Sequence, residues 1–175
     1  EKIFNKPQPF DTKNLPNHME KFSKQNKNRS LYFFDIIKPS MAWDFCLGMF
    51  RSVFKKEKWI ENLNVIDQDL INDTNLYSNF DNTCPHIKIF SNAFCKSKAY
   101  FQADPLIVAL KGEREWENLY SFVEIIRIPE VLDLYKKKGL PLFQFLHCKN
   151  YALRNFASYI VKIIFYKGET GLKYI

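Results

Sequence analysis

The sequence predicts an α+β protein with a mostly antiparallel sheet, helices packed on one face, and a long basic loop between two strands. Residues 86–90 alternate polar and apolar side chains, and residues 106–110 form a compact apolar run, as strands do. From 113 to 126, apolar residues recur at helical spacing. Residues 159–166 are rich in Ile and Val, which predicts a further strand. Strands and helices in this mixed order are typical of the α+β class.

The chain divides into a polar, basic N-terminal arm, residues 1–29, and a single domain, residues 30–175. Proline, lysine and asparagine dominate the arm, which predicts either a surface extension or a segment that contacts RNA or protein, with a short helix at about 16–26. Within the domain, apolar residues recur at mixed spacing from 30 to 54. This spacing predicts a core-facing helix, or two helices joined near Pro39.

The middle of the chain combines an acidic segment with a basic one. Residues 59–66 indicate the start of a strand, and residues 67–83, which contain four Asp and no Lys or Arg, predict a solvated loop. Residues 91–104 are the predicted long basic loop, and loops of that length are usually functional or disordered. Pro129 is expected to end one helix or to open the next. Residues 136–139 supply a basic last helical turn with a glycine stop.

The composition indicates a folded, basic protein. The chain has 175 residues, of which 26 are Lys or Arg and 19 are Asp or Glu, giving a net charge of +7, and 46% are hydrophobic. This balance excludes an acidic tail protein and a self-repelling disordered chain, and it favours an anionic partner. No run of 18 apolar residues is present, so the sequence predicts no membrane-spanning helix and no membrane partner. The chain begins with Glu, which is compatible with a processed or trimmed start.

No enzyme motif is recognisable in the sequence. Five glycines are too few for a Gly-rich nucleotide-binding protein, and the four cysteines lack C-x-x-C spacing. We therefore expect reduced thiols in a reducing compartment, no metal site, no cofactor and no enzyme activity. The remaining alternative for an enzyme pairs His147 with Cys84, Cys95 or Cys148 in a nucleophilic dyad.

The pattern of charges favours RNA binding instead. Basic residues are concentrated in windows 84–111 and 127–175, where Lys and Arg outnumber the acids. Such charges bind phosphates without reading base sequence, and loop aromatic residues stack on unpaired bases. The residues predicted to bind RNA are Lys88, Lys111, Arg114, Lys136, Lys137, Lys138, Lys149 and Arg154. The alternative is a solvated basic face with no nucleic-acid partner.

One ordered set of residues resembles a known family. The turn Lys111-Gly112-Glu113-Arg114, the helix start Trp116-Glu117, and the later Pro129 and Asp133 are similar to motifs of the large-subunit ribosomal protein five family. Further segments that agree in order are residues 32–39, 85–105, 150–151 and 163–165. The resemblance covers about residues 30–166. The glycines of the family's loop and both arginines of its second motif are absent from this chain.

The resemblance implies a structural constituent of a large ribosomal subunit, with an α+β domain at residues 30–175. The bias towards Phe, Asn, Lys and Ile points to a mitochondrial member, located in the mitochondrial matrix. The family would place the protein in the central protuberance, bound to large-subunit rRNA, to 5S rRNA if present, to neighbouring large-subunit proteins and to a small-subunit head protein. The loop at 91–104 would approach the peptidyl-site tRNA. Its predicted contacts are Asn92, Lys96, Lys98, Tyr100 and Phe101. The alternative is a structural subunit of another mitochondrial assembly, such as a respiratory complex.

Overall fold

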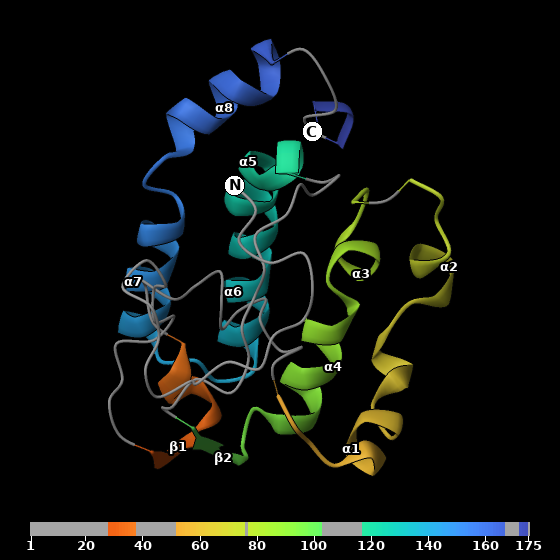
Figure 1. Ribbon diagram of the computed structural model, residues 1–175, viewed down its shortest axis with the longest axis vertical. Coiled ribbons are helices and arrows are strands. Elements are labelled where there is room, and N and C mark those ends of the chain that lie inside the picture. The colour runs from red at the N-terminus through yellow and green to blue at the C-terminus, as the bar shows by residue number, and fades with distance from the viewer. Residues whose placement is uncertain (1–27, 38–51, 76, 103–116, 167–171, 175) are drawn as a thin grey trace, which may run out of the picture.

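The computed structural model describes residues 28–37, 52–75, 77–102, 117–166 and 172–174. Within these ranges the protein is mostly helical (Figure 1), and its strands form one two-stranded antiparallel sheet. The predicted α+β fold with a mostly antiparallel sheet is therefore wrong. The predicted strand at 106–110, the arm helix at 16–26 and most of the helix expected from 30 to 54 lie outside the described residues.

The sheet joins two segments that were expected to have other structures. Strand β1 (Arg29–Tyr32) pairs with β2 (Lys98–Phe101) in a register that sets Arg29 opposite Phe101 and Tyr32 opposite Lys98. The short helix η1 (Phe33–Ile36) follows β1, and the backbone N–H of Phe33 donates to the Ser97 carbonyl at 3.1 Å. The described start of the helix predicted from residue 30 is thus a strand and one short helical turn.

The first helical group covers the segments that were predicted to be the start of a strand, an acidic loop and a second strand. Its elements are α1 (Lys56–Ile60), η5 (Leu63–Val65), α2 (Gln68–Ile71), α3 (Phe80–Thr83) and α4 (Pro85–Phe94). The Asp67 carboxylate caps α2 by accepting from two backbone N–H groups, and the Asn79 side chain caps α3. The Asp and Asn residues of the predicted loop therefore start helices rather than fill a solvated turn.

Helix α4 replaces both the predicted strand at 86–90 and the first part of the predicted basic loop. Pro85 occupies its first turn, where the missing N–H costs nothing. Ile87 and Phe90 are buried and lie three residues apart, which places them on one helical face. Because α4 continues to Phe94 and β2 begins at Lys98, the expected long loop between two strands is not formed.

The second helical group agrees better with the prediction from sequence than the first group does. Its elements are η6 (Glu117–Leu119), α5 (Tyr120–Phe122), the π-helical turn η7 (Val123–Arg127), α6 (Ile128–Lys137), α7 (Leu142–Ala152), α8 (Phe156–Phe165) and η8 (Leu172–Tyr174). Helical structure from 117 to 126 is confirmed. Pro129 lies in the first turn of α6, and Gly139 ends that helix with a φ of 106°. The strand predicted at 159–166 is wrong, because this segment belongs to α8.

Among the described residues, two apolar cores hold these helices together. In the larger core, Val131, Leu132 and Tyr135 of α6 are buried between α4 and α7, which flank α6 in Figure 1. In the smaller core, Phe122 of α5 packs against Ile163 of α8. None of the helices in the described ranges is long and apolar enough to cross a membrane.

Candidate nucleic-acid interface

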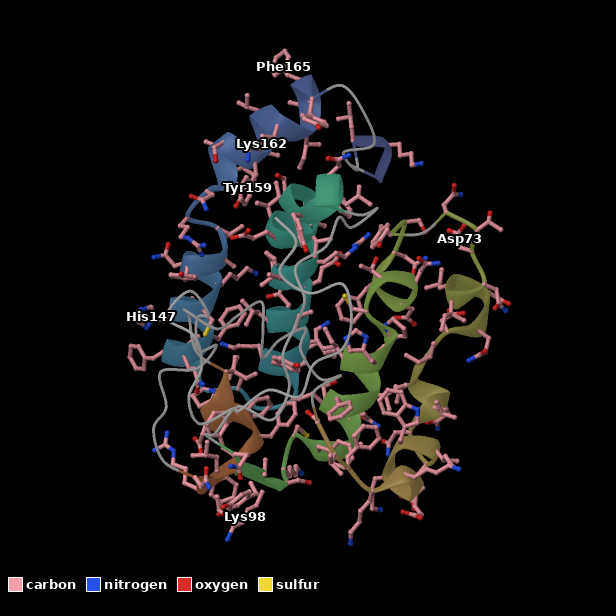
Figure 2. The ribbon with its side chains drawn as sticks, viewed as in Figure 1. Asp73, Lys98, His147, Tyr159, Lys162 and Phe165 are labelled. Atoms are coloured by element: carbon pink, nitrogen blue, oxygen red, sulfur yellow. The ribbon has the colours of Figure 1, made fainter. Side chains whose placement is uncertain are left out.

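The two-stranded sheet presents one exposed face that combines tyrosines with a lysine. Side chains alternate across a strand, so Lys98 and Tyr100 of β2 share a face, and the register sets Tyr32 of β1 opposite Lys98. Tyr32 is 58% exposed and Tyr100 is 67% exposed. Lys98 points away from the body of the protein (Figure 2), and its Nζ lies 5.7 Å from the centre of the Tyr32 ring. We call Tyr32, Lys98 and Tyr100 the ribbon face.

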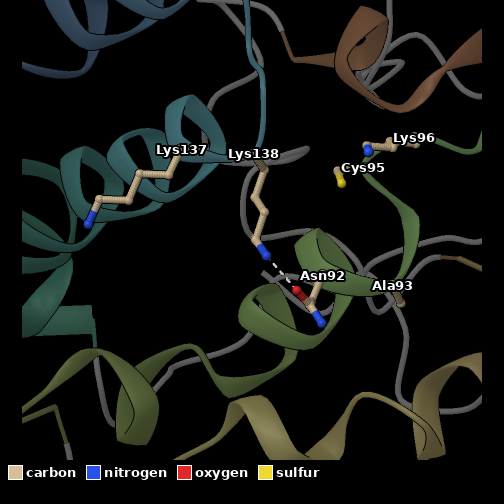
Figure 3. Close-up of a pocket in the computed structure, with 6 residues that line it drawn as sticks. All are labelled: Asn92, Ala93, Cys95, Lys96, Lys137 and Lys138. Carbon is tan, nitrogen blue, oxygen red and sulfur yellow. Dashed lines mark hydrogen bonds between the residues drawn. The ribbon is translucent and has the colours of Figure 1, made fainter.

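A pocket of about 450 Å³ lies beside the start of β2, where the C-terminal ends of α4 and α6 meet. The described residues that line it are Asn92, Ala93, Cys95, Lys96, Lys137 and Lys138, and none of these is acidic. In Figure 3, Lys138 points towards Asn92, whereas the Lys137 side chain extends away from it. We call these six residues the lysine pocket. Lys96 joins it to the ribbon face, because only Ser97 separates Lys96 from β2.

The lysine pocket is organised by a chain of side-chain amides. The Lys138 ammonium group donates to Asn92 Oδ1, and Asn92 Nδ2 in turn donates to Asn62 Oδ1 at 2.6 Å. Asn62 Nδ2 then donates to the Lys58 carbonyl at 2.7 Å. This chain links α6, α4 and α1, so the pocket is held by three helices. Asn92, predicted as a tRNA contact, instead positions Lys138.

The structure gives Lys88 a different role from the predicted one. Its ammonium group is 2.7 Å and 2.9 Å from the two carboxylate oxygens of Asp81. Asp81 is buried, and its Oδ2 also accepts from the backbone N–H of Asp67 at 2.9 Å. A lysine neutralised by a buried carboxylate is not available to neutralise a phosphate. Lys88 therefore ties α4 to the segment that precedes it.

Three other predicted contacts are also engaged within the protein. Lys149 pairs with Asp133 at 2.8 Å, and both Lys136 and Lys149 lie over the Phe145 ring. Arg154 lies 3.5 Å from the buried Glu124 carboxylate. These contacts fasten α6 to α7 and the loop before α8 to η7. Lys111 and Arg114 lie outside the described residues.

Apart from Asn92, the tRNA-contact residues predicted at 91–104 divide into two groups. Lys96, Lys98 and Tyr100 are exposed and lie together on the pocket rim and the ribbon face. Phe101 points to the other side of the ribbon and is half-buried. Tyr32 was not predicted, because its segment was interpreted as a helix. Its pairing with Lys98 depends on the register between two strands that are far apart in the sequence. No local sequence pattern indicates such a register.

Cys84 and Cys148, two of the three thiols considered for the alternative nucleophilic dyad, do not have the properties of a nucleophile. Burial raises the pKa of Cys84 to about 12 and that of Cys148 to about 11, so both thiols stay protonated near neutral pH. His147 is exposed and points outward from α7 (Figure 2), whereas the neighbouring Cys148 is buried. Within the described ranges, no group of His, Cys, Asp and Glu is arranged to hold a metal ion.

No protein-family model, curated protein or solved structure matches the chain.

Proposed function

We propose that this chain is a structural RNA-binding protein and a constituent of the mitochondrial large ribosomal subunit. The observation that supports RNA binding is the junction of the ribbon face with the lysine pocket. There, exposed lysines lie beside two exposed tyrosines, and no acidic side chain is among the described lining of the pocket. The acidic residue nearest to Tyr32 in the sequence is Asp35. Its carboxylate is engaged locally, because it accepts a hydrogen bond of 2.9 Å from the Tyr32 backbone N–H.

The proposed mechanism is scaffolding by charge and stacking. Lys96, Lys98 and Lys138 neutralise phosphates of one RNA strand, which fixes the position of the strand without reading its sequence. Tyr32 and Tyr100 stack on unpaired bases, and such stacking accepts any base. The paired strands and the amide chain hold these groups in place before RNA binds, which lowers the entropy lost on binding.

The ribosomal part of the proposal is supported by the resemblance of Lys111-Gly112-Glu113-Arg114 and the motifs that follow it to the large-subunit ribosomal protein five family. The proposed partners are large-subunit rRNA, 5S rRNA if present, the peptidyl-site tRNA, neighbouring large-subunit proteins and a small-subunit head protein. The family's α+β fold does not support the assignment, because the described chain is mostly helical. The contact with tRNA is accordingly proposed for Lys96, Lys98 and Tyr100 rather than for a long loop.

Sedimentation tests the ribosomal assignment. The full chain, carrying an affinity tag, is expressed in mitochondria, and the lysate is separated on a sucrose gradient with and without ribonuclease. We expect the chain to co-migrate with large-subunit rRNA and to leave those fractions after ribonuclease treatment. Migration apart from the rRNA in the untreated gradient would overturn the assignment.

A second candidate is a structural subunit of another mitochondrial assembly, such as a respiratory complex. The observation that favours it is the exposed apolar side of α8, where Val161, Ile164 and Phe165 lie at the surface. In that case the chain migrates with a membrane complex in detergent, and ribonuclease leaves its position unchanged.

A further inference from the structure

The lysine pocket holds positive charge that no carboxylate of the described chain neutralises. Lys96, Lys137 and Lys138 line it, and none of the three forms an ion pair with an acidic residue in the described ranges. By contrast, Lys88 and Lys149, which were also predicted to bind RNA, are paired with carboxylates. The charge of the pocket is therefore available to an anionic ligand.

The ends of two helices reduce this charge without cancelling it. Helices α4 and α6 both end at the pocket, and a helix C-terminus carries about half a negative charge. At the end of α4, the Phe94 carbonyl accepts from the Ser97 backbone N–H at 2.8 Å. At the end of α6, the Tyr135 carbonyl accepts from the Leu140 backbone N–H at 2.9 Å. Three ammonium groups against about one negative charge leave a local charge of about +2.

The lining of the pocket suits a compact anion and not a nucleobase. Its volume of about 450 Å³ is typical of small-molecule sites, but such sites are mostly lined by apolar and aromatic side chains. None of the described lining residues is aromatic, so a base has no ring to stack on inside the pocket. Tyr32 and Tyr100 are exposed on the adjoining ribbon face. A ligand that uses both regions places a phosphate in the pocket and a base on the ribbon face.

The contact between Lys138 and Asn92 limits how far an RNA strand continues. It joins the ends of α6 and α4, and Figure 3 shows it between the two helices, with Cys95 and Lys96 lying towards β2. Asn92 is a neutral acceptor, so Lys138 keeps its charge and has two further N–H donors for a ligand. A strand that passes Lys96 from the ribbon face meets this contact and ends at the pocket.

We propose that the lysine pocket binds a terminal phosphate of single-stranded RNA, with the adjoining bases on the ribbon face. This inference rests on the proposed RNA binding and names the chemical group that the RNA presents. A phosphate monoester carries about 1.5 to 2 negative charges near pH 7, which matches the local charge of about +2. An internal phosphodiester carries about one negative charge and leaves part of that charge uncompensated. Lys96 and Lys138 donate charge-assisted hydrogen bonds to the terminal oxygens.

Binding of the full chain to three RNA oligonucleotides of one sequence tests this inference. All three carry an internal fluorescent label, and they have a 5′ phosphate, a 3′ phosphate or hydroxyl groups at both ends. We expect anisotropy to show about ten-fold tighter binding of a phosphorylated end, as for one additional charge-assisted hydrogen bond. Lys138→Gln should lose most of this preference. Lys98→Gln should weaken binding of all three equally, and Lys136→Gln, which removes the same charge outside the described lining, should keep the preference.

Alkylation of Cys95 shows whether the phosphate enters this pocket. The parent chain is treated with iodoacetamide, and the modified Cys95 peptide is measured by mass spectrometry. We expect the phosphorylated oligonucleotide to slow the alkylation, because Cys95 lines the pocket. Adenosine monophosphate should protect Cys95 only at much higher concentration, because it has no strand to lie on the ribbon face. Equal protection by the two at one concentration would assign the pocket to free nucleotides and overturn the inference.

The outcomes separate this inference from the proposed function. Equal affinities for the three oligonucleotides, or alkylation of Cys95 at one rate with and without phosphorylated RNA, would overturn the inference and leave RNA binding in place. No binding of any oligonucleotide would overturn both. Circular dichroism and the thermal midpoint show that each variant is folded. If Lys138→Gln does not fold, Lys96→Gln changes an exposed residue and should lose the same preference.

Discussion

Replacing Lys88 by Met is expected to destabilise the protein and to leave its RNA binding unchanged. Lys88 was predicted from sequence to contact RNA, but its ammonium group is bound by both oxygens of the Asp81 carboxylate. The Met side chain keeps most of the apolar stem and removes the charge. The Asp81 carboxylate, whose side chain is 4% exposed, is then left with only the Asp67 N–H as a hydrogen-bond donor among the described contacts.

The magnitude follows from burial on the two sides of the pair. Removing one partner of a fully buried ion pair costs about 3–5 kcal/mol, because the remaining charge is left without compensation. The Lys88 side chain is 31% exposed, so water reaches the site and the expected loss is nearer 2–3 kcal/mol. For a protein of this size, that loss lowers the thermal midpoint by roughly 4–12 °C.

The assay is urea unfolding of the parent, Lys88→Met, Asp81→Asn and the double variant. We expect each single change to lower the free energy of unfolding, and the double change to lower it by less than the sum, which gives a coupling energy of about 1–3 kcal/mol. A neutral Lys88→Met variant with weakened RNA binding would refute the structural role of this lysine. Additive losses would show that the two side chains do not interact.

Three further changes have defined outcomes. Gly139→Ala should lower the free energy of unfolding, measured in urea, by about 1–2 kcal/mol. The cause is the backbone, since φ is 106° at this position and no atom lies within 4 Å of the new methyl group. Gly139→Asn should lower the free energy of unfolding by less, and equal losses in the two variants would contradict the backbone explanation. Burial raises the pKa of Cys84 from 9.0 to about 12, so above about pH 9 the unfolded chain loses this proton first and the stability of the fold decreases as pH rises. Between about pH 8 and pH 10, the decrease in the free energy of unfolding should be about 1 kcal/mol smaller in Cys84→Ala than in the parent. An identical decrease in both proteins would count against the raised pKa. Tyr100→Ala should weaken binding of single-stranded RNA about ten-fold while Tyr100→Phe binds like the parent, measured by fluorescence anisotropy, because stacking needs the ring and not the hydroxyl; loss in both variants would argue against stacking.

The helices that the sequence predicted correctly are those whose apolar residues recur with a single clear periodicity. Around Pro129 and Gly139, proline in a first turn and glycine after a basic last turn mark the ends of α6, and the structure has both. Residues 86–90 were predicted to be a strand because their polar and apolar residues alternate, but Ile87, Phe90 and Phe94 also lie on one helical face. The helical pattern prevails because that face packs on α6.

Helix α8 shows why composition misled the strand prediction at 159–166. Ile and Val favour strands as isolated residues, but tertiary packing overrides such a preference. Here the buried Ile163 is flanked at helical spacing by Tyr159 and Ile160, which pack against the same cluster. The other Ile and Val residues of the segment, Val161 and Ile164, are exposed, and the sequence alone gives no reason to expect that exposure.

The candidate interface was predicted only in part, for a similar reason. The exposed Lys96, Lys98 and Tyr100 were found because a cluster of cations and aromatic residues is visible in the sequence. Which of the remaining lysines are neutralised depends on the approach of distant acids, as with Lys149 and Asp133. Net charge counts these lysines as available, whereas the structure pairs them.

The central claim, that the ribbon face and the lysine pocket bind RNA, is tested most directly by a charge-reversal titration. Lys96→Glu/Lys98→Glu is compared with Lys55→Glu/Lys56→Glu, which makes the same change in net charge at exposed residues beside α1. Binding of the full chain to labelled single-stranded RNA is measured by anisotropy over a range of salt concentrations. We expect the first pair to lose at least about ten-fold in affinity and about 1.4 in the slope of log K against log salt, as for two lost phosphate contacts, with unchanged thermal stability. Equal losses in both pairs, or no change in slope in the first, would contradict the claim.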